Sequence, residues 1–192
     1  MMNRLTLLAA LTTLAAPLAM AQTTTWTPDK AHSGVDFSIQ HLSLSHVHGH
    51  FGNIGGAIVL NQADITKSTV NVTIDVNTVD TGVGGRDTDL KSDKFFDVAQ
   101  FPAATFVSTS VARTAKGLTV AGNLTLHGVT MPVVLEVKGP TGPVQGADQK
   151  PHEAFSASTT IIRSSFGIAP KYATSLIGDK VTLTINLEMI QQ

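Results

Sequence analysis

The sequence predicts an all-β protein that folds as one antiparallel β-barrel of about eight strands. Apolar and polar residues alternate in many short runs, which is the pattern of strands that bury one face. Gly, Pro, Asn and Asp separate these runs and predict turns, so successive strands are expected to run antiparallel. The 192 residues are 42% hydrophobic and 14% charged, which suits a single domain with one core.

Four runs show the alternation most clearly. Their apolar positions are Val70, Val72, Ile74 and Val76; Leu118, Val120, Leu124 and Leu126; Val133, Leu135 and Val137; and Val181, Leu183, Ile185 and Leu187. Weaker alternation with a β-rich composition marks four further segments, 35–39, 51–60, 104–113 and 152–162. Together they predict eight strands, a number at which antiparallel strands close into a barrel.

Two connections differ from the short turns. The segment 139–151 contains three Pro and three Gly, and we expect it to be a loop without regular structure. In the segment 85–96, a short helix or turn across one end of the barrel is predicted from Asp87, Leu90, Phe95 and Phe96.

The first residues are typical of a signal peptide. A positive start at Arg4 precedes an apolar run over 5–20, and Ala19-Met20-Ala21 matches a cleavage site. We therefore expect residues 1–21 to be removed and residues 22–192 to form the barrel domain of an exported protein. An uncleaved anchor is disfavoured because the run is short of the ~20 residues of a spanning helix and is interrupted by Pro17.

Composition excludes several classes of protein. A membrane β-barrel carries aromatic girdles, but this chain has one Trp, one Tyr and 5% aromatic residues, so a barrel that is not embedded in a membrane is predicted. A net charge of −1 without a basic block argues against nucleic acid as a partner. The absence of Cys excludes thiol catalysis, iron–sulfur clusters and Cys-based zinc sites.

The run His46-Val47-His48-Gly49-His50 is the strongest hint of a metal site. On a strand the three histidines share a face, but His46 and His50 are then about 13 Å apart at the backbone, too far to close on one zinc ion. Two of them need a third ligand from elsewhere, such as His32 or His41. The alternative is a His-rich polar strand near the barrel rim, and we predict no bound metal or other cofactor.

No motif indicates catalysis. The loop 82–87 has neither the spacing of a phosphate-binding loop nor a βαβ setting, and no G-x-S-x-G nucleophile motif is present. Asp87, Asp89, Asp93 and Asp97 form a run that is typical of a solvated face. We therefore expect a protein without enzymatic activity.

Arg86, Asp87 and Arg163 stand beside apolar or Gly-rich stretches. At a barrel mouth these side chains could hold the polar head of a ligand whose tail occupies the interior. The alternative is a structural ion pair that ties the short helix to a strand.

Taken together, the motifs resemble those of the YceI family of periplasmic polyisoprenoid-binding proteins. The resemblance is carried, in order, by Trp26-Thr27-Pro28-Asp29-Lys30-Ala31-His32-Ser33, Val35-x-Phe37, Gly49-x-Phe51, Thr78-Val79-Asp80-Thr81, Arg86-Asp87-x-x-Leu90-Lys91-Ser92-x-x-Phe95-Phe96-Asp97, Phe101-Pro102-x-x-x-Phe106, Gly122-Asn123-Leu124-Thr125-Leu126-His127-Gly128-Val129-Thr130-x-Pro132-Val133, Arg163-Ser164-x-Phe166-Gly167-Ile168 and Gly178-Asp179-x-Val181. The sequence departs from the family at Ser165, where Asp is common, and in the His46–His50 run.

The resemblance implies a lipocalin-like, eight-stranded antiparallel barrel with a long apolar pocket for a polyisoprenoid, an isoprenoid quinone or another long-chain amphiphilic lipid. The residues expected to line that pocket are Phe37, Ile39, Phe51, Val72, Ile74, Phe106, Leu124, Leu135, Phe155, Phe166, Ile168 and Leu183. About half of them are expected to serve in core packing instead, because a closed barrel also needs solid ends.

The resulting prediction is a periplasmic protein that carries or sequesters an isoprenoid-type lipid. One alternative is a metal-binding protein or small metalloenzyme that uses His46, His48 and His50. Another is a structural or stress-related interaction module with a filled core. Exposed barrel rims would also allow a homodimer.

Overall fold

The structure, a computed structural model, describes residues 23–192. The predicted signal peptide, residues 1–21, therefore lies outside the described residues. Among the described residues, no helix has the length and apolar character needed to cross a bilayer.

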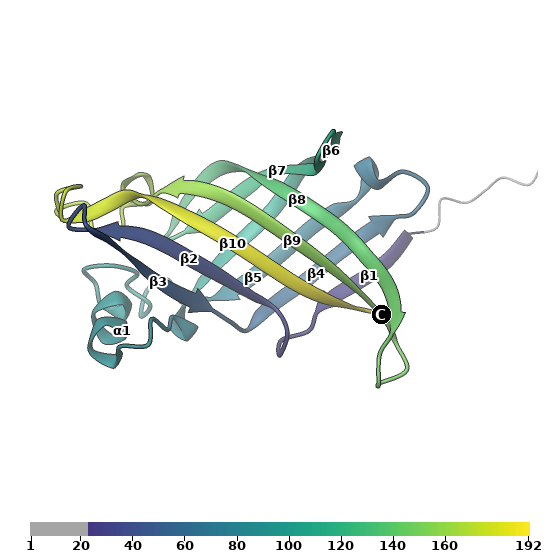
Figure 1. Cartoon of the computed structure of the whole chain (residues 1–192), viewed down its shortest axis with the longest axis horizontal. Helices are drawn as coiled ribbons and strands as arrows, with labels where there is room; N and C mark the ends of the chain where they lie inside the picture. Colours follow the sequence, from purple (N-terminus) through teal and green to yellow (C-terminus); the bar gives the residue numbers. More distant parts are fainter. Residues whose placement is uncertain (1–22) are drawn as a thin grey trace, which may run out of the picture.

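Ten strands of residues 23–192 form one antiparallel sheet in the order β1-β4-β5-β6-β7-β8-β9-β10-β2-β3, and β1 also pairs with β10 (Figure 1). This last pairing closes eight strands, β1 together with β4 through β10, into a ring. The predicted eight-stranded antiparallel barrel is therefore confirmed. The strands are β1 (Thr23–Pro28), β2 (Gly34–His41), β3 (Ser45–Phe51), β4 (Ile54–Asn61), β5 (Thr69–Asp75), β6 (Ala103–Thr114), β7 (Gly117–Leu126), β8 (Val129–Gln145), β9 (Pro151–Ile162) and β10 (Ile177–Gln191).

The hairpin of β2 and β3 extends the barrel wall at one end. The last residues of β10 pair with β1, whereas its earlier residues, from Ile177 to Asn186, pair with β2. On the other side of the hairpin, the backbone of His50 in β3 exchanges two hydrogen bonds with Asp80. At this end, β2 and β3 therefore occupy the position beside β10 that β1 and β4 occupy at the other end.

Two predicted boundaries differ from the structure. The run 23–28 forms β1 although it was not predicted, because its alternating buried positions include Thr24 and Pro28 and give no apolar period. The predicted strand 51–60 is divided, since Asn53 adopts φ +51° and turns the chain between β3 and β4.

The prediction of a loop over 139–151 is wrong. Strand β8 continues to Gln145, and only residues 146–150 connect it to β9. The register between β8 and β9 shifts twice, at Gly139 and at Gly142, and both glycines have positive φ values of +114° and +119°. The two Gly-Pro pairs thus lie at β-bulges, where a strand tolerates the missing N–H of proline.

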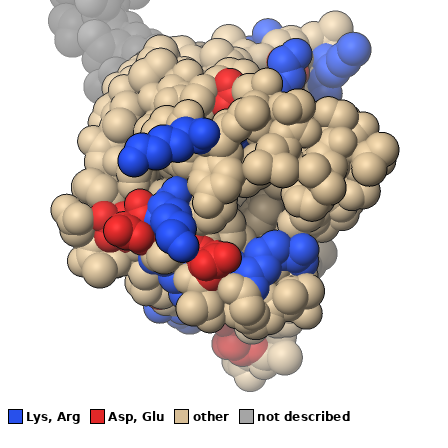
Figure 2. Space-filling view, turned by 90° about the vertical axis from the view of Figure 1, so that its left-hand side faces the viewer, with Lys and Arg blue, Asp and Glu red and all other residues tan. Residues whose placement is uncertain are grey.

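The predicted short helix is confirmed as α1 (Gly84–Lys91), with turns over 92–96. It lies at the end of the barrel where the β2–β3 hairpin projects (Figure 1). Seen from that end, charged side chains of both signs lie on a larger uncharged surface (Figure 2). Three short 3-10 turns complete the described secondary structure: η1 (Ile65–Lys67), η2 (Val76–Thr78) and η3 (Arg163–Phe166).

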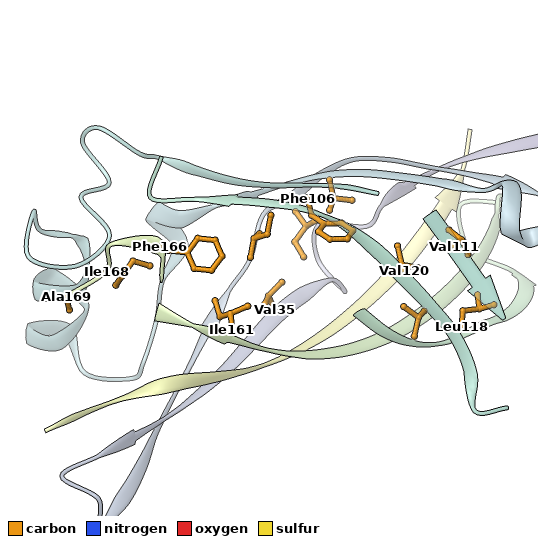
Figure 3. Packing of buried hydrophobic residues seen from close by; sticks show 13 residues of the cluster. Val35, Phe106, Val111, Leu118, Val120, Ile161, Phe166, Ile168 and Ala169 are labelled. Atoms are coloured by element: carbon orange, nitrogen blue, oxygen red, sulfur yellow. The ribbon is translucent and has the colours of Figure 1, made fainter. Parts of the chain in front are cut away.

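Buried apolar side chains form two clusters inside the barrel. The larger one runs along the barrel from Ile168 and Phe166 at one end, past Phe106, to Leu118 at the other (Figure 3). The smaller one consists of Trp26, Ile58, Leu60 and Met189, of which Trp26 and Met189 are 1% and 0% exposed.

Candidate functional site

The interior of the barrel holds two adjoining apolar cavities. The outer cavity has a volume of about 310 Å³ and the inner one about 130 Å³. Val35, Ile74, Leu124 and Leu183 line both, so the two cavities are compartments of one tunnel, which we call the apolar tunnel. The outer compartment is already within the usual range of small-molecule sites, roughly 300–1,000 Å³.

The tunnel follows from the alternation of the strands. In register, Val72 of β5 lies opposite Phe106 of β6, which lies opposite Leu124 of β7. Successive side chains of a strand point to opposite faces, so a row of this kind places one apolar residue per strand on the inner wall.

Eleven of the twelve residues predicted to line a pocket do line the tunnel. The outer compartment is lined by Phe37, Ile39, Phe51, Ile74, Leu124, Ile168 and Leu183, and the inner one by Val72, Ile74, Phe106, Leu124, Leu135, Phe155 and Leu183. Phe166 lines neither compartment and is 2% exposed in the larger core cluster. Contact of these residues with a ligand stays a prediction.

Sequence reasoning missed part of the tunnel wall. Val35 and Val181 belong to predicted strands, so their alternation could have identified them. Leu90, Phe95 and Phe96 reach the outer compartment from the segment around α1, where strand alternation gives no signal. Phe96 also packs edge-on against Phe51, with ring centroids 5.5 Å apart.

Exposed polar side chains mark the open end of the outer compartment. Gln40 and His41 at the end of β2 and Asp89 on α1 are exposed and also line this compartment, so it reaches the solvent there. Arg86 lines it too and donates hydrogen bonds to the hydroxyl and the carbonyl oxygen of Thr81, at 2.8 and 3.0 Å.

Asp87 does not line the tunnel and has a structural role. Its carboxylate accepts hydrogen bonds from the backbone N–H and the hydroxyl of Thr81, at 2.9 and 2.5 Å. Thr81 therefore connects Asp87 to Arg86 and fixes the start of α1 against the end of the barrel.

Arg163 lines the outer compartment but is only 4% exposed, and its donors are fully used. Its guanidinium donates to five backbone carbonyls, those of Ile168, Ala169, Tyr172, Ile177 and Gly178, at 2.7–3.1 Å. A guanidinium has five N–H donors, so none remains for a ligand. Arg163 thus holds the chain between η3 and β10, through carbonyls rather than through the ion pair considered as the alternative.

The inner compartment ends on a closed floor. Ile58 and Leu60 line it, and they pack with the fully buried Trp26 and Met189 in the smaller core cluster. The Trp26 indole N–H donates to the Thr24 hydroxyl at 2.8 Å, which satisfies its one polar group. The tunnel is therefore open at the α1 end and blocked at the other.

A buried carboxyl group, that of Glu153, lies beyond this floor. Glu153 is 8% exposed, pairs with Met189 in register and shares the inner face of β9 with Phe155. Its Oε2 atom has no hydrogen-bond partner, and burial raises the pKa of the carboxyl group.

The three histidines of the His46–His50 run do not converge on one point. The three histidines lie exposed on the outer face of β3, while Val47 and Phe51 face the tunnel. The rings of His46 and His48 are 6.5 Å apart, and His50 Nδ1 lies 3.0 Å from Asp36 Oδ1. Within residues 23–192, the residues that come together as potential metal ligands are different ones, Asp29, His152 and Glu188.

Comparison with known proteins agrees with this architecture. A family model described as a YceI-like domain matches residues 26–189, nearly all of the described chain. The chain belongs to the YceI-like family. Protein YceI of Salmonella newport is 39% identical over 165 residues, which cover 84% of the chain and 83% of the relative.

Several solved structures share the barrel. Burkholderia cenocepacia BcnA has 25% identity and a TM-score of 0.71, with 84% of the chain and 98% of BcnA covered. The Campylobacter jejuni YCEI protein has 29% identity and a TM-score of 0.70, over 80% of the chain and 90% of that protein. A polyisoprenoid binding domain from Saccharophagus degradans, at 18% identity and a TM-score of 0.64 over 87% of the chain and 98% of the domain, shares the fold.

The departures from the YceI-like pattern lie outside the tunnel. Ser165 is exposed in η3 and lines neither compartment, and the three histidines of the His46–His50 run lie on the outer face of β3. These departures therefore do not change the side chains that line the tunnel.

Proposed function

We propose that this protein binds one long apolar ligand, of the polyisoprenoid or isoprenoid quinone class, in the apolar tunnel. The observation that carries the proposal is a tunnel with an apolar wall, a solvent-facing end beside α1 and a floor of Ile58 and Leu60 packed on Trp26 and Met189. A filled barrel would have no such space, because protein interiors pack to the density of organic crystals.

The gain in free energy depends on chain length. Each five-carbon prenyl unit that moves from water into the tunnel contributes on the order of 3–4 kcal/mol, at about 0.8 kcal/mol per carbon, before ordering costs. Two or three units contribute about 6–12 kcal/mol before these costs, and a longer chain is needed for a tight complex. We therefore expect the length of the ligand chain to be the main determinant of affinity. The closed floor limits the chain length that the tunnel can hold.

The polar head of the ligand would lie at the open end. Arg86 and Asp89 offer a cation and an anion there, next to Gln40 and His41. Of the three residues predicted for this role, we keep Arg86, because it lines the compartment and uses only Nε and Nη2 of its five-donor guanidinium on Thr81. Asp87 supports Arg86 indirectly through Thr81.

The Saccharophagus degradans protein that shares the fold is named as a polyisoprenoid binding domain, which supports a ligand of this class. Our proposal further includes export through the predicted signal peptide, a role in the periplasm as carrier or sequestering protein, and no chemical step. Nucleophilic catalysis requires a nucleophile beside a general base. Among the described residues, the tunnel wall holds no such pair.

Native mass spectrometry after gentle purification tests the proposal, with solvent extraction to identify the released molecule. We expect one apolar molecule per wild-type chain. Leu183→Asp places a charge between the two compartments and should abolish its retention, whereas Thr184→Asp, on the exposed outer face of the same strand, should not. A wild-type protein that carries no such molecule and takes up no prenyl alcohol would refute the proposal.

A further inference from the structure

A second group of polar side chains gathers outside the tunnel, on the outer face of the barrel at its closed end. Asp29 follows β1, His152 is near the start of β9 and Glu188 is near the end of β10. One potential ligand atom from each lies within 4.8 Å of the other two. We call these three residues the seam cluster, because β1 and β10 meet here and close the barrel.

The backbone explains why these distant residues meet. In the register of β9 and β10, Glu188 lies opposite Ala154, and His152 is two residues away on the same outer face. Diagonal neighbours of this kind are within reach of long side chains. The backbone N–H of Asp29 donates to the carbonyl of Glu188 at 2.8 Å, which fixes the turn after β1 beside them.

Two further residues with metal-binding side chains surround the seam cluster. His32 Nδ1 lies 2.9 Å from Asp29 Oδ2, and Asp148 Oδ1 lies 3.0 Å from His152 Nε2, while Glu188 Oε1 lies 2.8 Å from His152 Nδ1. Two imidazoles and three carboxylates from three separate segments thus converge within one small region. The His152 side chain is 13% exposed and that of Glu188 37%, so the region is sheltered but open to ions from solvent.

We propose that the seam cluster binds a divalent transition-metal ion of the zinc type. Asp29, His152 and Glu188 would each supply one ligand, and His32, Asp148 or water would supply the fourth. Imidazole with carboxylate is a donor set that suits zinc, whereas magnesium and calcium favour oxygen ligands alone. With bonds of about 2.0–2.1 Å, tetrahedral ligand atoms lie roughly 3.4 Å apart, a distance these side chains reach by small rotations.

Such an ion would tie the β1–β2 turn to β9 and β10. It would stabilise the folded barrel, because the unfolded chain does not hold the three ligands together. The site is separate from the apolar tunnel, since none of the three residues lines either compartment. The proposal therefore does not depend on the lipid-binding proposal.

Isothermal titration calorimetry with ZnCl₂ tests this proposal, on tag-free protein treated with a chelator and then desalted, near pH 7.5. We expect one ion per chain and a thermal midpoint that rises with zinc concentration. Asp29→Asn and Glu188→Gln keep the side-chain size and should each weaken zinc binding at least tenfold. Both variants are compared with wild type in metal-free thermal unfolding, so that loss of the ion is distinguished from loss of the fold.

The matched control is Asp36→Asn. Asp36 forms a His–Asp pair with His50 at 3.0 Å, close to the geometry of the His32–Asp29 pair, but no third ligand joins it among the described residues. Zinc binding should be unchanged in this variant. The proposal is overturned if wild-type protein shows no saturable one-site zinc binding, if Asp36→Asn weakens it as much as Glu188→Gln does, or if Mg²⁺ binds equally well. In the first case the cluster is a hydrogen-bonded structural contact.

Discussion

The inner compartment of the tunnel can be filled by a single substitution. Ala157 lies on the inner face of β9 and lines that compartment, whose volume is about 130 Å³. Ala157→Phe adds a phenyl ring of six carbons to this space. A ligand that reaches the floor in wild type would then lose the burial of about one prenyl unit.

The expected loss of affinity follows from this burial. Five carbons at about 0.8 kcal/mol each correspond to about 4 kcal/mol, and every 1.4 kcal/mol is a factor of ten. We therefore expect a 20-carbon prenyl alcohol to bind roughly 100- to 1,000-fold more weakly to Ala157→Phe. A ten-carbon prenyl alcohol, which the outer compartment can hold alone, should bind with nearly unchanged affinity. Titration calorimetry with both alcohols measures the difference.

The same variant also tests whether the barrel is hollow. Added carbons cost about 1–3 kcal/mol in a packed core, whereas in an open compartment they are accommodated at little cost. Urea unfolding followed by the fluorescence of Trp26, the single tryptophan, measures the free energy of unfolding. Ser158→Phe, on the exposed outer face of the same strand, is the matched control. Strong destabilisation by Ala157→Phe, or an equal loss of affinity for both alcohols, would refute our reasoning.

Three further predictions concern stability, each measured as the free energy of unfolding in urea. Arg163→Ala leaves five carbonyls without their donor and should cost at least about 3 kcal/mol, whereas Arg86→Ala, in a less buried position, should cost under about 1 kcal/mol. Gly56→Ala should cost about 2 kcal/mol or more, because Gly56 has φ +99° and a Cβ atom there would meet the Asn71 carbonyl; Gly55→Ala, with open space, should cost under about 0.5 kcal/mol. Wild type should lose stability as the pH rises and Glu153 ionises, and Glu153→Gln should not show this loss.

The sign of the Glu153 effect follows from its raised pKa. The folded state favours the protonated carboxyl, so its contribution to stability is complete below the ordinary pKa of 4.5 and is lost as the pH rises through the folded-state pKa. Comparison of wild type with Glu153→Gln across this window, in the presence of a chelator, isolates the one group. An equal pH dependence in both proteins would mean that Glu153 is solvated.

The chain by itself determined the class of fold and most of the tunnel wall. Alternation over 70–76, 118–126 and 181–187 predicts strands with one buried face, and eight such strands close into a barrel. Because period two fixes which side chains share a face, residues such as Val72 and Leu183 could be assigned to the interior before the structure was known.

Tertiary structure decided what the alternation cannot encode. Two glycines at positive φ keep β8 in the sheet where the Gly-Pro pairs predicted a loop, since a bulge absorbs the missing N–H group. Periodicity gives no information on whether inward residues meet or leave a space, so the floor at Trp26 and the open end beside α1 emerge only from the closed barrel. Barrel closure and strand register bring together Asp29, His152 and Glu188, which are far apart in the chain. By contrast, His46 and His48, only two residues apart, lie on the exposed face of β3.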